Sequence, residues 1–187
     1  MLRVLVVTGT IRTGRRTEKV AGLVLEELKK RESVAAVPLD IRDLNLPVLT
    51  ERYKYLKPEE IPAGLEVWRE AVLDADAIIL CVPEYNSGYP AALKNVLDSL
   101  ISEYRRKPFG IAAVSAGNSG LMMLASLRNV LYNLGAFAVP TTFRAIQAAK
   151  AWDESGKLVN EHYTKNANAL IDDVLFYATA FKSQIQP

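Results

Sequence analysis

A short segment near the start of the chain combines hydroxyl and guanidinium side chains at a spacing suited to phosphate. It reads Gly9-Thr10-Ile11-Arg12-Thr13-Gly14-Arg15-Arg16-Thr17. Thr10 and Thr17 supply hydroxyl donors, and the arginines can make charge-assisted or bidentate hydrogen bonds to phosphate oxygens. A helix that begins here would add its positive end, and arginines crowded at that end are easier to explain if an anion normally neutralises them.

The number and spacing of glycines in this segment indicate which kind of phosphate compound it could bind. With only Gly9 and Gly14, it lacks the three-glycine dinucleotide fingerprint, and it also lacks the Gly-Lys-Ser/Thr ending of a P-loop. A phosphomonoester such as that of FMN fits better than a pyrophosphate. The alternative is an ordinary strand-to-helix turn in which Thr17 caps the helix and the arginines are solvated.

A second candidate segment, Pro83-Glu84-Tyr85-Asn86-Ser87-Gly88-Tyr89-Pro90, follows a wholly apolar run. Its first proline stiffens the exit from that run, and Gly88 permits a sharp turn or a close backbone approach. Tyr85, Asn86 and Tyr89 match the flat faces and the polar edge of a flavin. The alternative is a rigid turn that leads into a helix with proline at its first position.

Five apolar runs and the amphipathic stretches between them predict the elements that position these segments. The predicted strands are Leu2–Thr8, Val34–Leu39, Ala77–Val82, Phe109–Ser115 and Ala136–Val139, the last of which stops at Pro140. The predicted helices are Thr17–Lys30, Ala63–Asp74, Pro90–Ile101, Leu121–Leu134 with Gly135 as its C-cap, and Glu161–Lys182. Asp40–Pro62 carries three prolines and is predicted as a long excursion without regular structure.

This alternation predicts an α/β fold with a parallel sheet, because parallel neighbours need crossover connections that cover both faces. Five units suit a flavodoxin-like three-layer sandwich with strand order 2-1-3-4-5. Ligands in such folds bind beyond the carboxyl ends of the strands, between strands one and three, where the two candidate segments would meet. No repeat or linker divides the chain, so residues 1–187 are predicted to form one domain.

The composition excludes several classes of function. The chain has 50% hydrophobic and 24% charged residues and a net charge of +2, with its basic residues spread along the sequence, so nucleic acid is not the favoured partner. No apolar run approaches the roughly 20 residues that span a bilayer, and no leader precedes the first strand. We therefore expect no membrane partner and a cytoplasmic location.

Cys81 and His162 are the only residues of their types. An intrachain disulfide is therefore impossible, and a His or Cys metal cluster is nearly excluded, so redox chemistry would need an organic cofactor. Cys81 lies in an apolar run and is interpreted as a buried strand residue, with a reactive thiol as the alternative. His162 is expected at the surface near the start of the last helix.

Residues Pro83 to Asp98 (PEYNSGYPAALKNVLD) closely resemble the signature loop and helix of the NADPH-dependent FMN reductase family. Gly9 to Thr17 resembles the phosphate loop of that family, and residues 115–120 (SAGNSG), with the later LRNVLYNLGAFAVP, resemble its third flavin-contacting segment. The resemblance runs from the first predicted strand to about Pro140. This flavodoxin-like family includes flavin, quinone, azo-dye and chromate reductases.

The resemblance implies a set of FMN contacts. Around the phosphate it implies Thr10, Arg12, Arg16 and Thr17, with Arg15 and Glu18 beside them. Around the isoalloxazine it implies Pro83, Glu84, Tyr85, Asn86, Ser87, Ser115 and Gly117. Two positions depart from the family pattern: Thr10 stands where serine is more frequent, and Leu121-Met122-Met123 stands where small or basic residues often follow the glycines. The second departure would alter the substrate entrance.

The resemblance also implies the reaction, in which NADPH or NADH reduces FMN and a small-molecule acceptor such as a flavin, quinone or azo compound takes the electrons. The flavin performs this chemistry, so we expect no catalytic side chain and no metal. A homodimer or dimer of dimers is implied, formed through the helix predicted at 90–101 and its neighbour. NADH or NADPH preference and the physiological acceptor stay open.

Two rival functions use the same cofactor. A flavodoxin-type electron carrier is usually strongly acidic, which this chain is not. A flavin-loaded redox sensor is not excluded by the residues. Two local questions also stay open: whether Tyr53-Lys54-Tyr55 in the long excursion covers the flavin across a dimer or only packs, and what Trp152 does.

Overall fold

Five parallel strands form one sheet in the middle of the protein. The computed structural model describes residues 1–117 and 120–185. The strands are β1 (Leu2–Thr8), β2 (Val34–Asp40), β3 (Ala77–Pro83), β4 (Pro108–Ser115) and β5 (Phe137–Ile146). Their order is β2-β1-β3-β4-β5 and all neighbouring pairs are parallel, which confirms the predicted order. The carboxyl ends of the strands therefore lie along one edge of the sheet.

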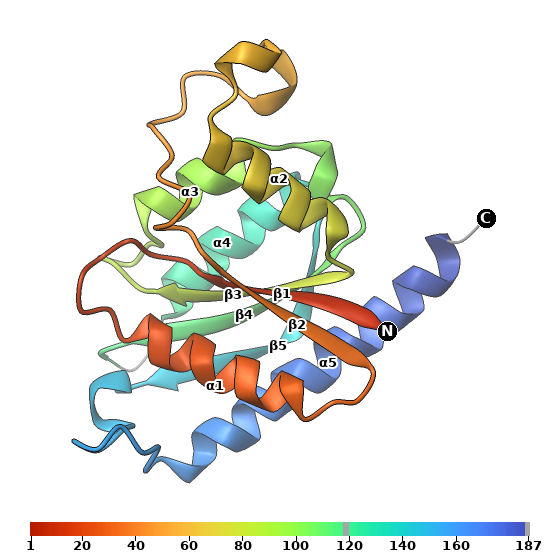
Figure 1. The fold of residues 1–187 in the computed structure, drawn as a ribbon. Helices are drawn as coiled ribbons and strands as arrows, with labels where there is room; N and C mark the ends of the chain where they lie inside the picture. The colour runs from red at the N-terminus through yellow and green to blue at the C-terminus, as the bar shows by residue number, and fades with distance from the viewer. Residues whose placement is uncertain (118–119, 186–187) are drawn as a thin grey trace.

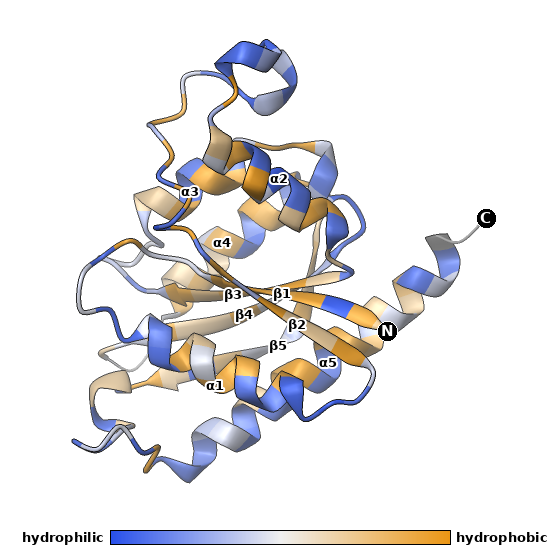
Figure 2. Cartoon of the chain, in the orientation of Figure 1, coloured by the Kyte–Doolittle hydropathy of each residue, from blue (hydrophilic) through white to orange (hydrophobic). Residues whose placement is uncertain are grey.

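Helices cover both faces of this sheet (Figure 1). On one face lie α1 (Thr17–Lys29) and α5 (Glu161–Ile185), and on the other lie α2 (Ala63–Asp74), α3 (Ala91–Asp98) and α4 (Leu121–Asn133). The predicted three-layer, flavodoxin-like sandwich is confirmed. In Figure 2, α1 and α2 carry hydrophobic and hydrophilic residues side by side, as expected for helices with one face on a sheet.

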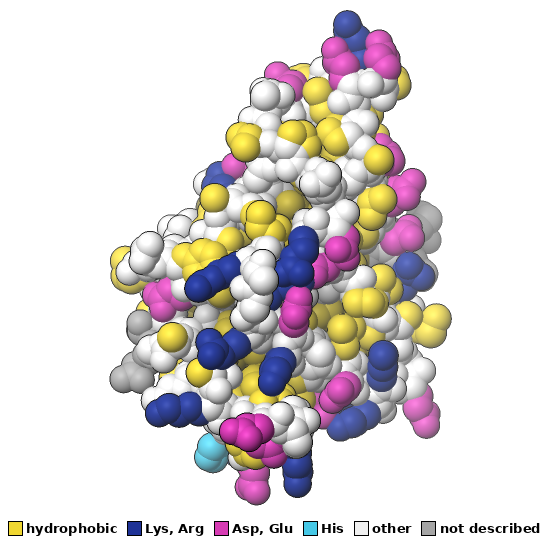
Figure 3. Space-filling view, turned by 60° about the vertical axis from the view of Figure 1, so that its left-hand side comes forward, with side chains coloured by type: hydrophobic (Ala, Val, Ile, Leu, Met, Phe, Trp, Pro, Cys, Tyr) yellow, Lys and Arg dark blue, Asp and Glu magenta, His cyan; other side chains and the backbone are white. Residues whose placement is uncertain are grey.

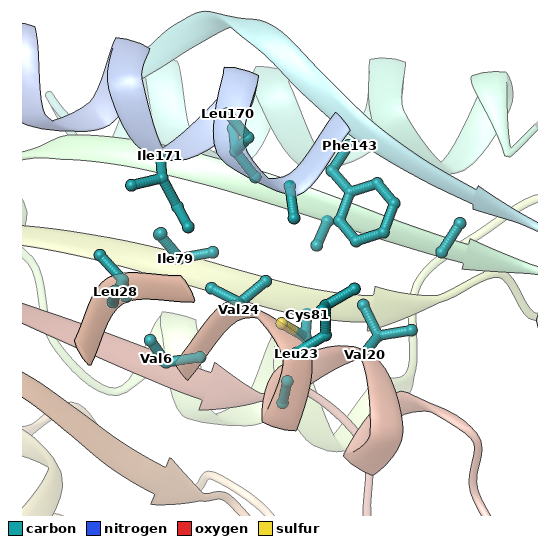
Figure 4. Close-up of a cluster of buried hydrophobic side chains, with 14 of the residues drawn as sticks. Val6, Val20, Leu23, Val24, Leu28, Ile79, Cys81, Phe143, Leu170 and Ile171 are labelled. Atoms are coloured by element: carbon teal, nitrogen blue, oxygen red, sulfur yellow. The ribbon is translucent and has the colours of Figure 1, made fainter. Parts of the chain in front are cut away.

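Two clusters of buried hydrophobic side chains, one on each face, hold the layers together. Figure 4 shows the cluster between the sheet, α1 and α5. In the other cluster Leu93, Val96, Leu97 and Leu100 are each at most 2% exposed, so the apolar stripe of the third predicted helix is core packing. Full burial of each such side chain stabilises the fold by about 1.5–3 kcal/mol. The carboxyl edge is thereby carried on a rigid support.

The last strand is longer than the sequence predicts. Phe109 pairs with Ala138 and Ile111 pairs with Thr142, so residues 139–141 lie opposite Gly110, and regular pairing then resumes to Ile146. Proline is tolerated in edge strands and at such irregularities, so the predicted stop at Pro140 is wrong. The extension carries the end of β5 to the same edge as the other strands.

The excursion between β2 and α2 contains two single-turn 3-10 helices, Tyr53–Tyr55 and Pro58–Glu60. It contains neither a strand nor an α-helix among its residues 41–62, all of which are described. The N–H of Tyr53 donates to the carbonyl of Ser99 (2.9 Å), and its hydroxyl donates to Glu66 (2.8 Å). In Figure 1 this part of the excursion projects beyond α2. Within the chain, Tyr53 thus packs on α2 and the end of α3.

Candidate functional site

A pocket lies where the loops after β1, β3, β4 and β5 meet. Its volume is about 160 Å³. Its lining residues are Arg12, Gly14, Arg15, Arg16, Thr17, Pro83, Glu84, Tyr85, Val114, Ser115, Ala116, Ala148 and Ala149. The structure thus brings together most of the residues that the sequence analysis selects. The others, which flank the lining, are Thr10, Glu18, Asn86, Ser87 and Gly117.

The loop between β1 and α1 turns tightly against β3. The N–H of Gly9 donates to the carbonyl of Cys81 (2.8 Å), and a Cβ atom on Gly9 would lie 3.0 Å from that oxygen, so a larger residue would push the loop away. Arg16, directly before α1, offers no side-chain cap, and Thr17 is already the first helical residue. The N–H of Lys19 donates to the carbonyl of Arg16 (3.1 Å), so the N–H groups of Thr17 and Glu18 are the ones available to an anion.

The side chains around this helix end divide into buried hydroxyls and exposed cations. Thr10 and Thr17 are each 1% exposed, whereas Arg12 and Arg16 are exposed. The two hydroxyls thus come from buried residues, while the two arginine side chains lie at the surface beside them. Hydroxyl, backbone N–H and guanidinium donors at the positive end of a helix are the donor set that a phosphomonoester requires.

Arg15 differs from its neighbours because its guanidinium points into the protein. Its side chain is 2% exposed and forms ion pairs with Glu18 and with Asp40 at the end of β2. It also donates to the carbonyl of Thr10. Burial alone would lower the pKa of Arg15, but hydrogen bonds to Asp40 and Glu18 raise that pKa above its usual value. Glu18 is accordingly an ion-pair partner of Arg15.

A hydrogen bond joins the two loops on which the sequence analysis concentrates. The hydroxyl of Thr10 lies 2.9 Å from the hydroxyl of Tyr85, and the N–H of Arg12 donates to the same Thr10 oxygen at 3.3 Å. The Arg12 guanidinium also lies over the Tyr85 ring, 5.9 Å from its centroid. Tyr85 therefore connects the phosphate end of the pocket to the loop after β3.

The loop after β3 closes as a two-residue turn. Tyr85 and Gly88 exchange backbone hydrogen bonds of 2.8 and 2.9 Å, and the residues between them, Asn86 and Ser87, have φ values of 49° and 66°. Positive φ at both central positions is typical of a type I′ turn. The left-handed positions are thus Asn86 and Ser87, whereas Gly88, which is predicted to permit a sharp turn or a close backbone approach, directly follows them. This compact turn connects the end of β3 to the start of α3.

The loop after β4 supplies a further wall. Ser115 ends β4, is 5% exposed, and donates its hydroxyl hydrogen to the carbonyl of Gly117 (3.0 Å). Asn118 and Ser119, part of the motif that resembles the third flavin-contacting segment, lie outside the described residues.

A fourth segment, after β5, is absent from the sequence-based prediction. Ala148 and Ala149 line the pocket directly after the strand ends at Ile146. The hydroxyl of Tyr163 in α5 donates to the carbonyl of Ile146 (2.7 Å), and the Trp152 ring packs edge-on against Tyr163 with centroids 5.5 Å apart. Trp152 thus packs behind this wall. Two alanines carry no chemical signal, and the predicted stop at Pro140 placed the end of β5 elsewhere.

The remaining reactive side chains lie away from the pocket or are inert. Cys81 is fully buried in β3, and burial raises the pKa of its thiol to about 12, which confirms a structural cysteine. His162 is exposed near the start of α5, as predicted. Among residues 1–117 and 120–185, no group of three or more His, Cys, Asp or Glu side chains is placed to hold a metal. In the same residues, no helix combines the length and apolar character needed to cross a bilayer.

The fold and the pocket define a flavodoxin-like protein with hydroxyl, backbone N–H and guanidinium donors at a helix end and a pocket between the neighbouring loops. Comparison with known families agrees: the NADPH-dependent FMN reductase family matches residues 2–151. The chain belongs to this family. It is an FMN-dependent NAD(P)H oxidoreductase.

Individual relatives support this assignment. An NAD(P)H-dependent FMN reductase from Nectria sp is 30% identical over 186 residues, which cover 84% of this chain and 90% of the relative. An FMN-dependent NADPH-azoreductase from Staphylococcus aureus is 26% identical over 176 residues, covering 92% and 93%. The solved structure of FerB, a flavoenzyme NAD(P)H:(acceptor) oxidoreductase from Paracoccus denitrificans, superposes with a TM-score of 0.74 at 20% identity, covering 95% of this chain and 99% of that chain, and shows the shared fold.

Proposed function

We propose that the pocket holds FMN with its phosphate at the N-terminus of α1 and its isoalloxazine along the loops after β3 and β4. The observation that carries this proposal is the pair of buried hydroxyls, Thr10 and Thr17, beside a helix end without a side-chain cap. Arg12 and Arg16 would neutralise the phosphate charge. The whole chain, residues 1–187, would act as one FMN-binding domain.

The ring would lie along Pro83, Glu84, Tyr85, Asn86 and Ser87, with Ser115 and Gly117 on its other flank. The chemistry that FMN supplies is acceptance of hydride from NAD(P)H and transfer of electrons to a second substrate. The protein would orient the ring and keep one face open. A cavity of about 160 Å³ is below the roughly 300–1,000 Å³ of typical ligand pockets, so it encloses only part of such a cofactor.

An open ring face leaves room for flat substrates to stack in turn. We therefore propose planar conjugated acceptors: a flavin, a quinone, or an azo compound, the last being the class that the name of the S. aureus azoreductase implies. The test is steady-state oxidation of NADPH and NADH by the purified protein, with FMN, a quinone and an azo dye as acceptors. Turnover with at least one acceptor is expected, and FMN binding without nicotinamide oxidation would contradict the proposal.

The phosphate assignment has its own test. Replacing Thr17 with valine removes the buried hydroxyl at nearly constant size, and loss of a hydrogen bond to a charged group should weaken FMN binding by roughly 10- to 100-fold. Thr179→Val in α5, whose hydroxyl bonds to Leu175 far from the pocket, is the matched control. Equal FMN affinity in the two variants would remove Thr17 from the site.

We further propose a homodimer, or a dimer of dimers, formed around α3. A groove beside the pocket is lined by Ile11, Val48 and the α3 residues Ala91 and Ala92, and Ile11 and Val48 are 54% and 84% exposed. Apolar side chains exposed together are typical of an interface. Val48→Asp should shift the protein toward monomer in sedimentation velocity. A wild-type protein that is monomeric and fully active at working concentration would contradict this assembly.

A cytoplasmic location is the last part of the proposal. The single cysteine, Cys81, is a free thiol, as is usual in reducing compartments. Cell fractionation followed by immunoblotting tests it, and recovery in an exported fraction would contradict it.

A further inference from the structure

One arginine of the phosphate loop is built into the protein interior. The Arg15 side chain is only 2% exposed, although it lies in a surface loop between two exposed arginines, Arg12 and Arg16. A guanidinium is seldom buried to this extent unless its charge is paired and its N–H groups are bonded. The bonding partners of Arg15 therefore show what it does.

All five N–H donors of the Arg15 guanidinium are directed at protein oxygens. Nε donates to Glu18 (2.8 Å), and Nη2 donates to Glu18 (2.6 Å) and to Asp40. Nη1 donates to Asp40 (3.0 Å) and to the Thr10 carbonyl. Because a guanidinium has no further N–H groups, a phosphate contact would require one of these bonds to break.

These bonds connect the loop to a strand on its other side. Asp40 ends β2, and its carboxylate also accepts the N–H of Arg42 (2.9 Å). The Arg42 side chain in turn donates to the carbonyl of Arg12 (2.8 Å). The carbonyls of Thr10 and Arg12 are thus both tied, through arginines, to the end of β2. This fixes the backbone between the two residues that carry phosphate-binding groups.

We propose that Arg15 is a positioning residue for the FMN phosphate. It holds the β1–α1 loop in its phosphate-binding shape through Asp40 and the Thr10 carbonyl, and it does not itself contact the phosphate. This inference rests on the proposed function, since it assumes that the loop binds FMN. The group formed by Arg15, Asp40, Glu18 and the Thr10 carbonyl is called the Arg15 cluster. The proposal predicts that this cluster sets the preference for FMN over riboflavin, which has the same ring and no phosphate.

A substitution of Asp40 distinguishes this positioning role from direct binding of the phosphate by Arg15. If Arg15 bound phosphate directly, Asp40 would compete for its charge, and Asp40→Asn would tighten FMN binding. If Arg15 instead holds the loop against Asp40, the same change loosens the loop and weakens FMN binding. The two roles therefore predict opposite signs for one substitution.

The experiment titrates flavin-free protein with FMN and with riboflavin and follows quenching of flavin fluorescence. Arg15→Gln, Arg15→Lys and Asp40→Asn are compared with the wild type. Lysine keeps the charge but cannot bond two carboxylates and a carbonyl together, so it should not rescue. Arg69→Gln is the matched control, because Arg69 is a partly buried arginine that pairs with Glu66 and Glu103 away from the pocket.

For each of the three cluster variants we expect about a tenfold or greater loss of FMN affinity, with riboflavin affinity within about threefold of wild type. Arg69→Gln should leave the ratio of the two affinities unchanged even if it lowers stability. An unchanged ratio in the cluster variants, or tighter FMN binding in Asp40→Asn, would overturn the inference. If Arg15→Gln does not fold, Asp40→Asn alone decides, since its sign distinguishes the roles. Failure of the wild type to bind FMN would instead refute the proposed function.

Discussion

At the scale of single residues, the pocket depends on side chains that bond to one another before any ligand arrives. Thr10 and Tyr85 come from different loops, and their hydroxyls lie 2.9 Å apart. Thr10 is 1% exposed, so its oxygen has little access to water when the bond is lost. Preorganisation of this kind lowers the entropy cost of closing two loops around a ligand.

Replacing Tyr85 with phenylalanine should therefore weaken FMN binding while leaving the ring contact in place. A neutral hydrogen bond contributes about 0.5–1.5 kcal/mol, so a roughly two- to tenfold rise in the FMN dissociation constant is expected. Fluorescence titration measures it. Tyr55→Phe serves as control, because Tyr55 is 61% exposed in the excursion. A dissociation constant for Tyr85→Phe equal to that of the control would show that the cross-link is dispensable.

At the scale of elements, the sequence predicts what is periodic and misses what depends on tertiary context. All five strands and all five α-helices of the described residues are predicted, because apolar runs and amphipathic stretches reflect burial on a sheet. The predicted end of the last strand at Pro140 is wrong because a proline is tolerated in β5 only through the edge position of that strand and its irregular register. Local sequence does not reveal either feature. The same error concealed the wall at Ala148 and Ala149. For Arg15, the sequence shows a cation near the site, but its burial depends on Asp40 at the end of another strand.

The wall after β5 yields a prediction of its own. Tyr163→Phe removes the bond from α5 to the Ile146 carbonyl, which leaves a carbonyl at the base of the wall without this donor. The free energy of unfolding should fall by about 1–3 kcal/mol, the usual cost of a buried polar group that loses its partner. Urea denaturation measures this change. An unfolding free energy within error of wild type would mean that packing against Trp152 alone holds the wall.

The contact between α1 and α5 predicts a dependence on pH. Burial alone would raise the pKa of Glu27, but hydrogen bonds from Lys30 and Asn168 lower it below its usual value. A carboxylate with a lowered folded-state pKa stabilises the protein above its unfolded-state pKa, and that contribution disappears as the pH falls through the folded-state pKa. The free energy of unfolding of Glu27→Gln should therefore fall less than that of the wild type as the pH is lowered from neutral to below the folded-state pKa of Glu27. Denaturant midpoints across this range provide the measurement, and equal losses in both proteins would contradict it.

At the scale of the whole molecule, a rigid sheet carries a group of loops whose charges are only partly balanced. Figure 3 brings this side of the molecule forward and shows basic side chains gathered on it with acidic ones among them. Asp40 and Glu18 pair with Arg15, while Arg12 and Arg16 stay exposed. A dianionic phosphate is then the natural counter-charge for the exposed pair. If FMN binds in this pocket as proposed, its binding should stabilise the entire fold, because the loops that line the pocket follow strands of one sheet.

Thermal unfolding tests this coupling. Ligand at about 100 times its dissociation constant adds about 2.7 kcal/mol to the folded state, provided that the unfolded chain does not bind it. For a domain of this size about 2–4 °C accompanies each kcal/mol, so FMN should raise Tm by roughly 5–10 °C. Riboflavin at the same concentration should raise it less, because the uncapped end of α1 and the two exposed arginines gain nothing from a ligand without phosphate. Equal shifts from the two flavins would mean that the ring loops bind without the phosphate loop, and the electrostatic account of this site would then be wrong.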